Sequence, residues 1–308
     1  ASPICSPTRA AMMTGRYVHE LGIWDNAFSY GGEPEGWGGH FSKRGVRFST
    51  VGKLDFRPGC EFGIQESHLA THRNKLDIHS LFREEEIFAR DDLFHRHMET
   101  GPAESNEAFS EDARIADRAA EWLEQDRPHQ EPWVLFVNFN NLHRPWNPSQ
   151  ELWDYYDPLV VLDDLDERFT EDLSRLHPYH RIFIRHHNGE RLGDEVMRRA
   201  LVGYYASCEV LDGHVGRVLS AIDQAGIRDE TLVVYASDHG GACGEHRNWD
   251  HGAMYDESIR CPMIFSGPGI RMGEVESSAV SMLDVFPTLC EFSGSRLPND
   301  IRGHSLLG

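Results

Sequence analysis

The chain has 308 residues, with 30 Lys and Arg against 50 Asp and Glu, which gives a formal net charge of −20 at pH 7. This charge argues against nucleic acid or an anionic membrane surface as the main partner. The length allows one large α/β domain, with or without part of a second. No run of 18 apolar residues occurs, so no membrane span is predicted, and we expect a soluble protein of the cytoplasm or periplasm. The six cysteines lack CxxC pairing, which indicates neither a zinc site nor a disulfide framework.

Near the start of the chain, a nucleophile-type residue precedes a predicted helix. The stretch reads Cys5-Ser6-Pro7-Thr8-Arg9-Ala10-Ala11-Met12-Met13-Thr14-Gly15-Arg16. Pro7 suits a first helical turn, because its missing N–H costs nothing there, and Gly15 ends the helix. Unpaired N–H groups and the helix dipole would favour an anion beside Cys5. Arg9, one turn further on, could brace the loop or neutralise charge.

The spacing Cys5-x-Pro7-x-Arg9, followed by Thr14-Gly15-Arg16, resembles the signature of the type I sulfatases in the alkaline phosphatase superfamily. The resemblance implies a three-layer α/β sandwich around a central mixed, mostly parallel sheet. It also implies that a formylglycine-generating enzyme converts Cys5 to formylglycine, whose hydrated aldehyde attacks the sulfur of a sulfate ester. In the family a strand with two metal-binding aspartates precedes the motif and a small subdomain follows the main domain. We therefore expect residues 1–308 to be a sulfatase catalytic domain truncated at both ends.

An asparagine follows the predicted helix. The segment 17–26 is predicted to be a loop that returns toward Cys5. A loop asparagine most often caps or turns the chain. Choline-sulfatase-like and phosphonate-monoester-hydrolase-like members of the family, however, carry an asparagine at this place that contacts the transferred group. The resemblance therefore makes Asn26 a candidate substrate-binding residue.

Residues 41–56 have the pattern of a helix end, a glycine turn, a short buried strand and a functional loop. The lysine that holds the sulfate and the nucleophile in the family matches Lys53. Asp55 stands where the family has a histidine that helps break down the covalent sulfate intermediate. A carboxylate there can still accept a proton, but its charge would repel a sulfate. The alternative is that Lys53 and Asp55 simply pair.

A second candidate element ends in a histidine. Residues 57–105 carry little signal and are interpreted as a family-variable insertion, with a solvated helix face at 83–86. Beyond them, 110–123 predict an amphipathic helix and 133–139 a strand buried on both faces. His143 follows this strand at the edge where open α/β sheets bind ligands. The resemblance places His143 against the ester oxygen, as the candidate general acid that protonates the leaving alcohol.

The candidate metal ligands follow another strand. Residues 194–224 predict the longest amphipathic helix, to which we assign no chemistry, and 231–236 predict a buried strand. Asp238 and His239 come directly after that strand. The resemblance implies that this pair binds a divalent cation, usually calcium, together with the residue formed from Cys5.

His251 departs from the family pattern, which has a lysine at its position. At an unperturbed pKa of ~6.5 an imidazole is cationic only in mildly acidic solution, although a neighbouring anion would raise that pKa. His251 is then either a substrate-binding residue that supplies charge or a proton, or a residue that packs against Trp249 or pairs with Asp250.

These features predict hydrolysis of a small-molecule or carbohydrate sulfate ester, in which the metal, the helix N-terminus, Arg9 and Lys53 stabilise charge on the transferring oxygens. A phosphonate monoester or phosphodiester hydrolase with the same nucleophile is the alternative among enzymes, because Asn26 and Asp55 both allow it. A non-catalytic sulfatase-like binding protein is the alternative of a different class. In that case Asp55 and His251 would mark a decayed site.

Overall fold

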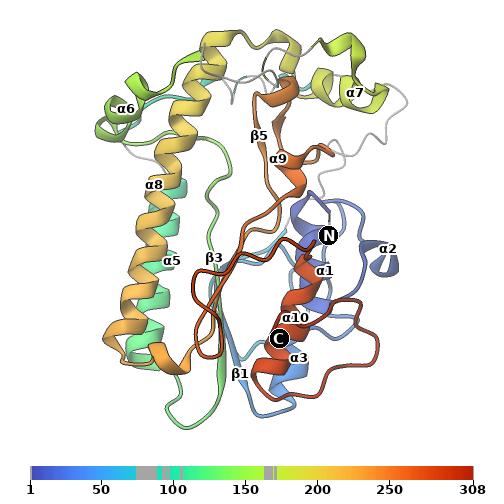
Figure 1. Cartoon of the computed structure of the whole chain (residues 1–308), viewed down its shortest axis with the longest axis vertical. Coiled ribbons are helices and arrows are strands. Elements are labelled where there is room, and N and C mark those ends of the chain that lie inside the picture. Colours follow the sequence, from blue (N-terminus) through green and yellow to red (C-terminus); the bar gives the residue numbers. More distant parts are fainter. Residues whose placement is uncertain are drawn as a thin grey trace.

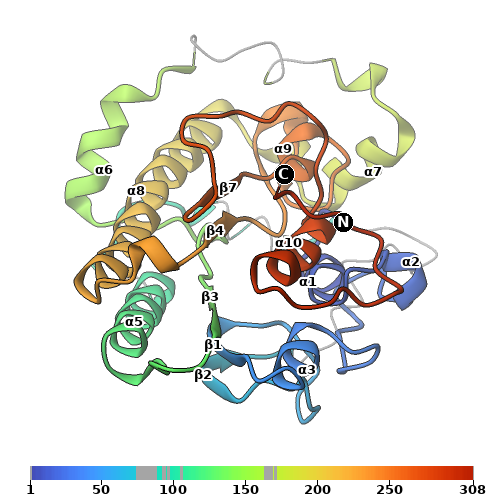
Figure 2. The same ribbon diagram turned by 60° about the horizontal axis from the view of Figure 1, so that its bottom comes forward.

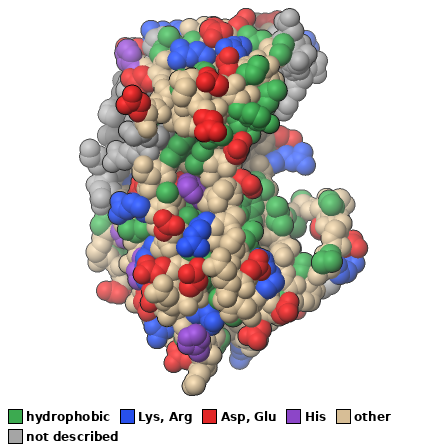
Figure 3. All heavy atoms as spheres, turned by 90° about the vertical axis from the view of Figure 1, so that its left-hand side faces the viewer, with side chains coloured by type: hydrophobic (Ala, Val, Ile, Leu, Met, Phe, Trp, Pro, Cys, Tyr) green, Lys and Arg blue, Asp and Glu red, His purple; other side chains and the backbone are tan. Residues whose placement is uncertain are grey.

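The computed structural model describes residues 2–73, 89–91, 95, 98–104, 107–162, 169 and 172–307 (Figure 1). The solvated helix face expected at 83–86 lies outside the described residues. Within the described part, no helix combines the length and the apolarity that crossing a bilayer requires. On the face that carries α8 (Asp194–Gln224), acidic and basic side chains are interspersed (Figure 3). The negative net charge is therefore not gathered into one patch on this face.

A parallel sheet of three strands has β1 (Arg47–Lys53) in its middle, in the order β2-β1-β3. β3 (Trp133–Asn138) pairs along the whole strand, from Arg47 beside Trp133 to Gly52 beside Asn138. β2 (Glu66–Thr71) pairs on the other side of β1. The sequence interpretation of 57–105 as a variable insertion was wrong for β2. Its residues, Glu-Ser-His-Leu-Ala-Thr, are largely polar and half-exposed, so they give no apolar signal.

The remaining strands are antiparallel. β4 (Val233–Ala236) pairs with β7 (Met263–Ser266), and the short β5 (Ala242–Cys243) pairs with β6 (Trp249–Asp250). The chain thus mixes parallel and antiparallel pairing with helices, which confirms the α/β class. Among the described residues no ladder joins β3 to β4. β3 therefore has a strand partner on one side only, and most of its residues are half-buried where full burial was predicted.

Helices cover the strands from both sides, which gives three layers (Figure 2). One layer holds α1 (Cys5–Thr14), α3 (Trp37–Ser42) and α10 (Val285–Phe292), and the other holds α5 (Glu107–Glu121) and α8. Along β3, Val134 and Phe136 pack against the first layer, whereas Leu135 and Val137 pack against the second. This alternation follows from the two-residue period of a strand. The other described α-helices are α2 (Val18–Leu21), α6 (Gln150–Tyr156), α7 (Pro178–His186) and α9 (Asp256–Ile259).

Two helix boundaries show how local sequence acts. α1 ends at Gly15, whose φ of 66° is left-handed and whose N–H donates to the carbonyl of Ala11. α5 begins at Glu107, ahead of the predicted start at Ser110, and continues into a π-helical turn over Trp122–Asp126. The segment 17–26 was predicted to be a loop and contains the single turn of α2.

The buried His40 of α3 predicts a loss of stability in mild acid. Its ring lies edge-on to Phe41 and Phe286, and its Nε2 is 3.5 Å from the sulfur of Cys290. Burial, assisted by Arg44, lowers the pKa of His40 to about 4. His40 therefore binds a proton near pH 6.5 in the unfolded chain but only near pH 4 in the folded chain. Between these values the unfolded state binds more protons, so stability falls as the pH falls. Because of His40, we expect the free energy of unfolding to fall by about 1–2 kcal/mol between pH 7 and pH 5.

Urea unfolding at pH 7 and pH 5 measures this effect. His40→Leu should remove about 1–2 kcal/mol of the difference between the two pH values, whereas His19→Leu, at an exposed histidine, should leave the difference unchanged. An equal pH dependence in His40→Leu and the parent would contradict the assignment.

Candidate active site around Cys5

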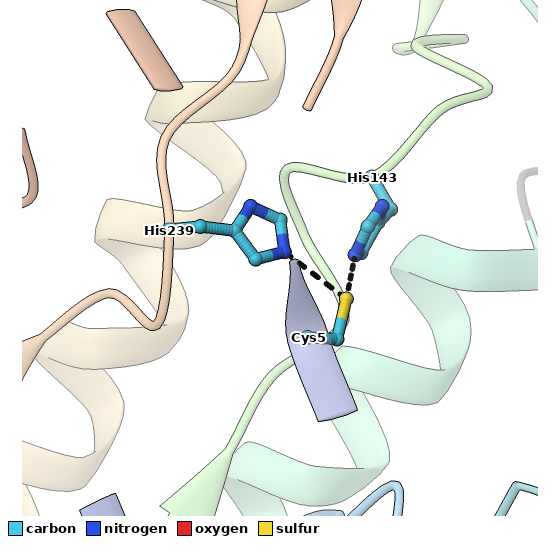
Figure 4. A group of neighbouring side chains, drawn as sticks. All are labelled: Cys5, His143 and His239. Atoms are coloured by element: carbon cyan, nitrogen blue, oxygen red, sulfur yellow. Dashed lines mark hydrogen bonds between the residues drawn. The ribbon is translucent and has the colours of Figure 1, made fainter. Parts of the chain in front are cut away.

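Cys5 lies in the first turn of α1 and is 1% exposed. Its sulfur is 3.0 Å from Nε2 of His239 and 3.5 Å from Nε2 of His143 (Figure 4). The Nζ of Lys53 is 3.8 Å from the same sulfur. These three partners come from the end of β1 and from the loops that follow β3 and β4, so three strands deliver polar groups to one atom. The structure thus brings together four of the residues that the sequence singled out.

The environment of Cys5 favours the thiolate. Burial alone would raise the pKa of the thiol, but the charge of Lys53, followed by the contact with His143, outweighs it and holds the pKa well below its ordinary value. The site is thus built for a negative charge at residue 5.

Asn26 reaches the same helix start, where its Oδ1 accepts a hydrogen bond of 3.0 Å from the backbone N–H of Ser6. Asn26 is 20 residues from Ser6 and does not occupy the N-cap, which is Ile4 and makes no side-chain bond, so the contact is a long-range one that ties the loop to the start of α1. Pro7 has no N–H, and the N–H of Thr8 donates to the carbonyl of Ile4. The expectation that free N–H groups of α1 would receive the anion therefore fails at these three residues. The positive charge beside Cys5 comes from side chains.

Arg9 links the elements that meet at the site. Its Nε donates to Oδ2 of Asp238 at 2.7 Å. Its Nη1 donates to the carbonyl of Lys53 at 2.8 Å and to Oδ1 of Asn138 at 3.1 Å. Since Arg9 is only 7% exposed, these bonds hold α1 against β1, β3 and the loop after β4 in a largely dry environment. In this arrangement Arg9 acts as a brace between elements.

Asp238 and His239 are both fixed by hydrogen bonds. Asp238 shares its Oδ2 with Arg9, and its Oδ1 accepts from the backbone N–H of His239 at 3.2 Å. The Nδ1 of His239 is 2.8 Å from the carbonyl of Gly240, which can only accept. Nδ1 therefore carries the proton, and in the neutral imidazole the lone pair of Nε2 points at Cys5.

Two cations hold the carboxylate of Asp55. Its Oδ2 is 3.5 Å from Nζ of Lys53 and accepts from Nη2 of Arg73 at 2.7 Å. The structure therefore shows the pairing that was the alternative at the sequence level. Arg73 was missed, because it lies in the segment taken as a variable insertion. Between two positive groups, Asp55 repels an incoming anion less than its charge alone suggests.

His251 has a built-in counter-ion. Its Nδ1 is 2.5 Å from Oδ1 of Asp250, and Nη2 of Arg144 donates to the other oxygen of Asp250 at 2.8 Å. The imidazole of His251 stacks on that of His239 with centroids 4.2 Å apart. Burial alone would lower the pKa of His251, but Asp250 raises it to about 10. The structure therefore shows the pairing with Asp250 that was one of the two alternatives, and it makes His251 a cation at neutral pH.

The pKa of His143 is shifted in the opposite direction. The charge of Lys53 and then burial lower the pKa of His143, although Cys5 partly opposes both. The imidazole is therefore neutral in the resting site. The sequence offered Asp250 as a partner of His251 but gave no sign of Arg144, which binds the other oxygen of Asp250. The adjacency of Asp250 to His251 was a usable signal, whereas Arg144 is 106 residues away from Asp250 and gave none.

Comparisons with known proteins point to one family over almost the whole chain. A model of the sulfatase family matches residues 1–295. Arylsulfatase K of Bos taurus is 29% identical, and that of Homo sapiens is 28% identical, each over 99% of this chain. The chain spans 57% of the length of these curated relatives.

Solved structures show the same fold. Phosphonate monoester hydrolase from Silicibacter pomeroyi superposes with a TM-score of 0.76 at 21% identity, over 98% of this chain and 66% of its own. A 2-O GAG sulfatase superposes with a TM-score of 0.70 at 22% identity, over 99% of this chain and 64% of its own. At these identities the likeness establishes architecture, while the family model and the arylsulfatase relatives cover the sequence itself. The chain belongs to the sulfatase family.

Proposed function

We propose that this protein hydrolyses a sulfate monoester, with residue 5 as the nucleophile after its conversion to formylglycine. One observation carries the proposal. In a member of the sulfatase family, the buried atom at the conversion position is surrounded by Lys53, His143 and His239, with the cationic His251 stacked beside them. Positive groups around a nucleophile suit the transfer of an anionic group.

The chain's own residues supply the steps around the nucleophile. A hydroxyl oxygen on residue 5 would bond to the sulfur of the ester while the bond from sulfur to the leaving oxygen breaks. Lys53 and His251 would stabilise the negative charge on the sulfate oxygens. His143, neutral at rest, would take the proton that the attacking hydroxyl loses and give it to the leaving oxygen as the bond from sulfur to that oxygen breaks. Loss of a proton from the second hydroxyl would then release sulfate and restore the aldehyde.

Sulfatases generally use a divalent cation besides formylglycine, and calcium was our expectation for this chain. Calcium takes six to eight oxygen ligands. Near Cys5 the described residues offer Asp238, whose Oδ2 is bonded to Arg9, and the nitrogen of His239. This donor set does not by itself fit calcium, so we route no step through the ion.

The two departures from the family pattern support an enzyme over a decayed binding protein. Asp55 is matched by Lys53 and Arg73, and His251 is matched by Asp250. A decayed site would have no need of such compensating partners. The substrate we propose is a sulfated carbohydrate, since a structural neighbour with a TM-score of 0.71 was solved with its substrate D-glucosamine-2-N,6-O-disulfate.

The test uses the full-length protein made with and without a formylglycine-generating enzyme. Mass spectrometry of the Cys5 peptide measures conversion, and kcat/KM is compared for a sulfate monoester, a phosphonate monoester, a phosphodiester and a sulfated glucosamine. We expect the sulfate esters to be preferred and activity to follow conversion. Preference for the phosphonate would establish the alternative enzyme. A converted but inactive protein would establish the binding protein.

Charge at residue 251 gives a separate prediction. His251→Lys should keep kcat/KM within about tenfold at pH 7.5, because the cation is retained, whereas His251→Gln should lower kcat/KM by about 10²–10³-fold. The ratio between the two variants is the measurement, since both remove the imidazole ring that stacks on His239. Equal losses in the two variants would show that His251 acts by packing.

A further inference from the structure

We propose that the unconverted chain, with Cys5 retained as a cysteine, binds Zn²⁺ through the sulfur of Cys5 and the Nε2 atoms of His143 and His239. The donor atoms of these three residues all lie within 4.8 Å of one another. The site concerns the chain before conversion, so the inference stands independently of the reaction proposed for the converted protein.

The geometry fits a tetrahedral ion. Zinc binds sulfur at about 2.3 Å and nitrogen at about 2.0–2.1 Å, which places a sulfur and a nitrogen ligand roughly 3.5 Å apart around a tetrahedral ion. The Cys5 sulfur is 3.5 Å from Nε2 of His143 and 3.0 Å from Nε2 of His239. A shift of about half an ångström at His239 completes the arrangement. Three protein ligands leave a fourth position for water.

The hydrogen bonds and the donor types of these residues also favour zinc binding. The Nδ1 of His239 donates to the carbonyl of Gly240, which orients the ring and leaves Nε2 free to coordinate. Thiolate and imidazole are donors that zinc prefers and calcium does not. The same pocket therefore discriminates against the cation expected for the converted protein.

A neighbouring cluster, His143, Asp250 and His251, also brings three potential ligands together. Its carboxylate already binds Arg144 through one oxygen and His251 through the other. A metal there would compete with Arg144 or His251 for whichever oxygen it used, so we place the ion at the Cys5 cluster.

Lys53 opposes the ion and so provides a test of position. Its Nζ is 3.8 Å from the Cys5 sulfur, where its positive charge stabilises the thiolate but repels a cation. Lys53→Met should therefore tighten zinc binding at the Cys5 cluster. The affinity of any distant surface site for zinc should stay the same.

The experiment uses the full-length protein made without a formylglycine-generating enzyme and stripped of metal. Calorimetry with Zn²⁺ alone should show one tight site, at least about 100-fold weaker in Cys5→Ser and in His239→Gln, because losing even an outer-shell partner of a zinc ligand costs about 10–100-fold. Cys60→Ser, at a cysteine outside the cluster, should bind like the parent. Cobalt added in place of zinc should show a thiolate charge-transfer band that Cys5→Ser lacks.

Thermal unfolding of the metal-free variants confirms that each one folds. Zinc should raise the melting temperature of the parent and of Cys60→Ser and have little effect on Cys5→Ser. Zinc binding that survives both Cys5→Ser and His239→Gln, or cobalt binding without the thiolate band, would overturn the proposal.

Discussion

Replacing Cys5 by alanine in the converted full-length protein is expected to lower kcat/KM for a sulfate monoester by on the order of 10⁴-fold or more. The variant keeps Lys53, His143 and His251 but loses the atom that would bond to sulfur. Charge stabilisation without a nucleophile leaves only a small residual rate in other hydrolases that form a covalent intermediate.

The control is Cys60→Ala, which removes a cysteine outside the cluster and should retain full activity. Unfolding by urea should show that Cys5→Ala has lost no more than about 2 kcal/mol, since alanine is only slightly smaller than cysteine. Activity above about a tenth of the parent value in Cys5→Ala would exclude residue 5 as the nucleophile.

Arg9→Met is expected to destabilise the fold by about 3–5 kcal/mol, because it removes the only ion-pair partner that the described residues give to Oδ2 of Asp238, whose side chain is 16% exposed. The methionine also cannot donate to the carbonyl of Lys53 or to Asn138, so two further acceptors lose their hydrogen bond. The measurement is the urea midpoint at constant m-value.

Arg16→Met is the matched control within the same motif. Arg16 pairs with Asp300 at 3.0 Å, but the Asp300 side chain is 69% exposed, and exposed pairs contribute about 0–1 kcal/mol. Equal destabilisation by the two variants would show that Arg9 contributes no more than a surface arginine. Asp238→Asn provides a second check, since it keeps the shape of the carboxylate and removes its charge.

The sequence predicted elements best where one pattern ran without interruption. The bounds 194–224 agree with α8 to the residue, because an amphipathic pattern ends at Gly226, which has a positive φ of 68°. β2 was missed because its residues are polar and form a strand only by pairing with β1. The local sequence carries no signal of pairing between distant segments.

The same distinction applies to the site. Cys5, Lys53, His143 and His239 were found because they match residues of the family's motifs, and each match stands at a predicted helix start or just after a predicted strand. Their charge states could not be found in that way. The lowered pKa of His143 depends on Lys53, which is distant in the sequence, whereas the neighbouring Asp250 that raises the pKa of His251 could be seen in the sequence. The three-ligand cluster at Cys5 likewise has no spacing motif, because its members are 138 and 234 residues from Cys5.

The separation of Cys5 from His239 in the sequence also limits the time during which the thiol is accessible. Cys5 is synthesised 234 residues before His239, and at about 5–20 residues per second the interval is roughly 10–50 s. Once His143 and His239 have folded against it, the thiol is enclosed and only 1% exposed. If residue 5 is converted as we propose, the enzyme that oxidises this thiol must reach it before the later part of the chain has folded around it. The converted fraction then depends on the speed of translation, so slower synthesis should yield more modified protein from the same gene.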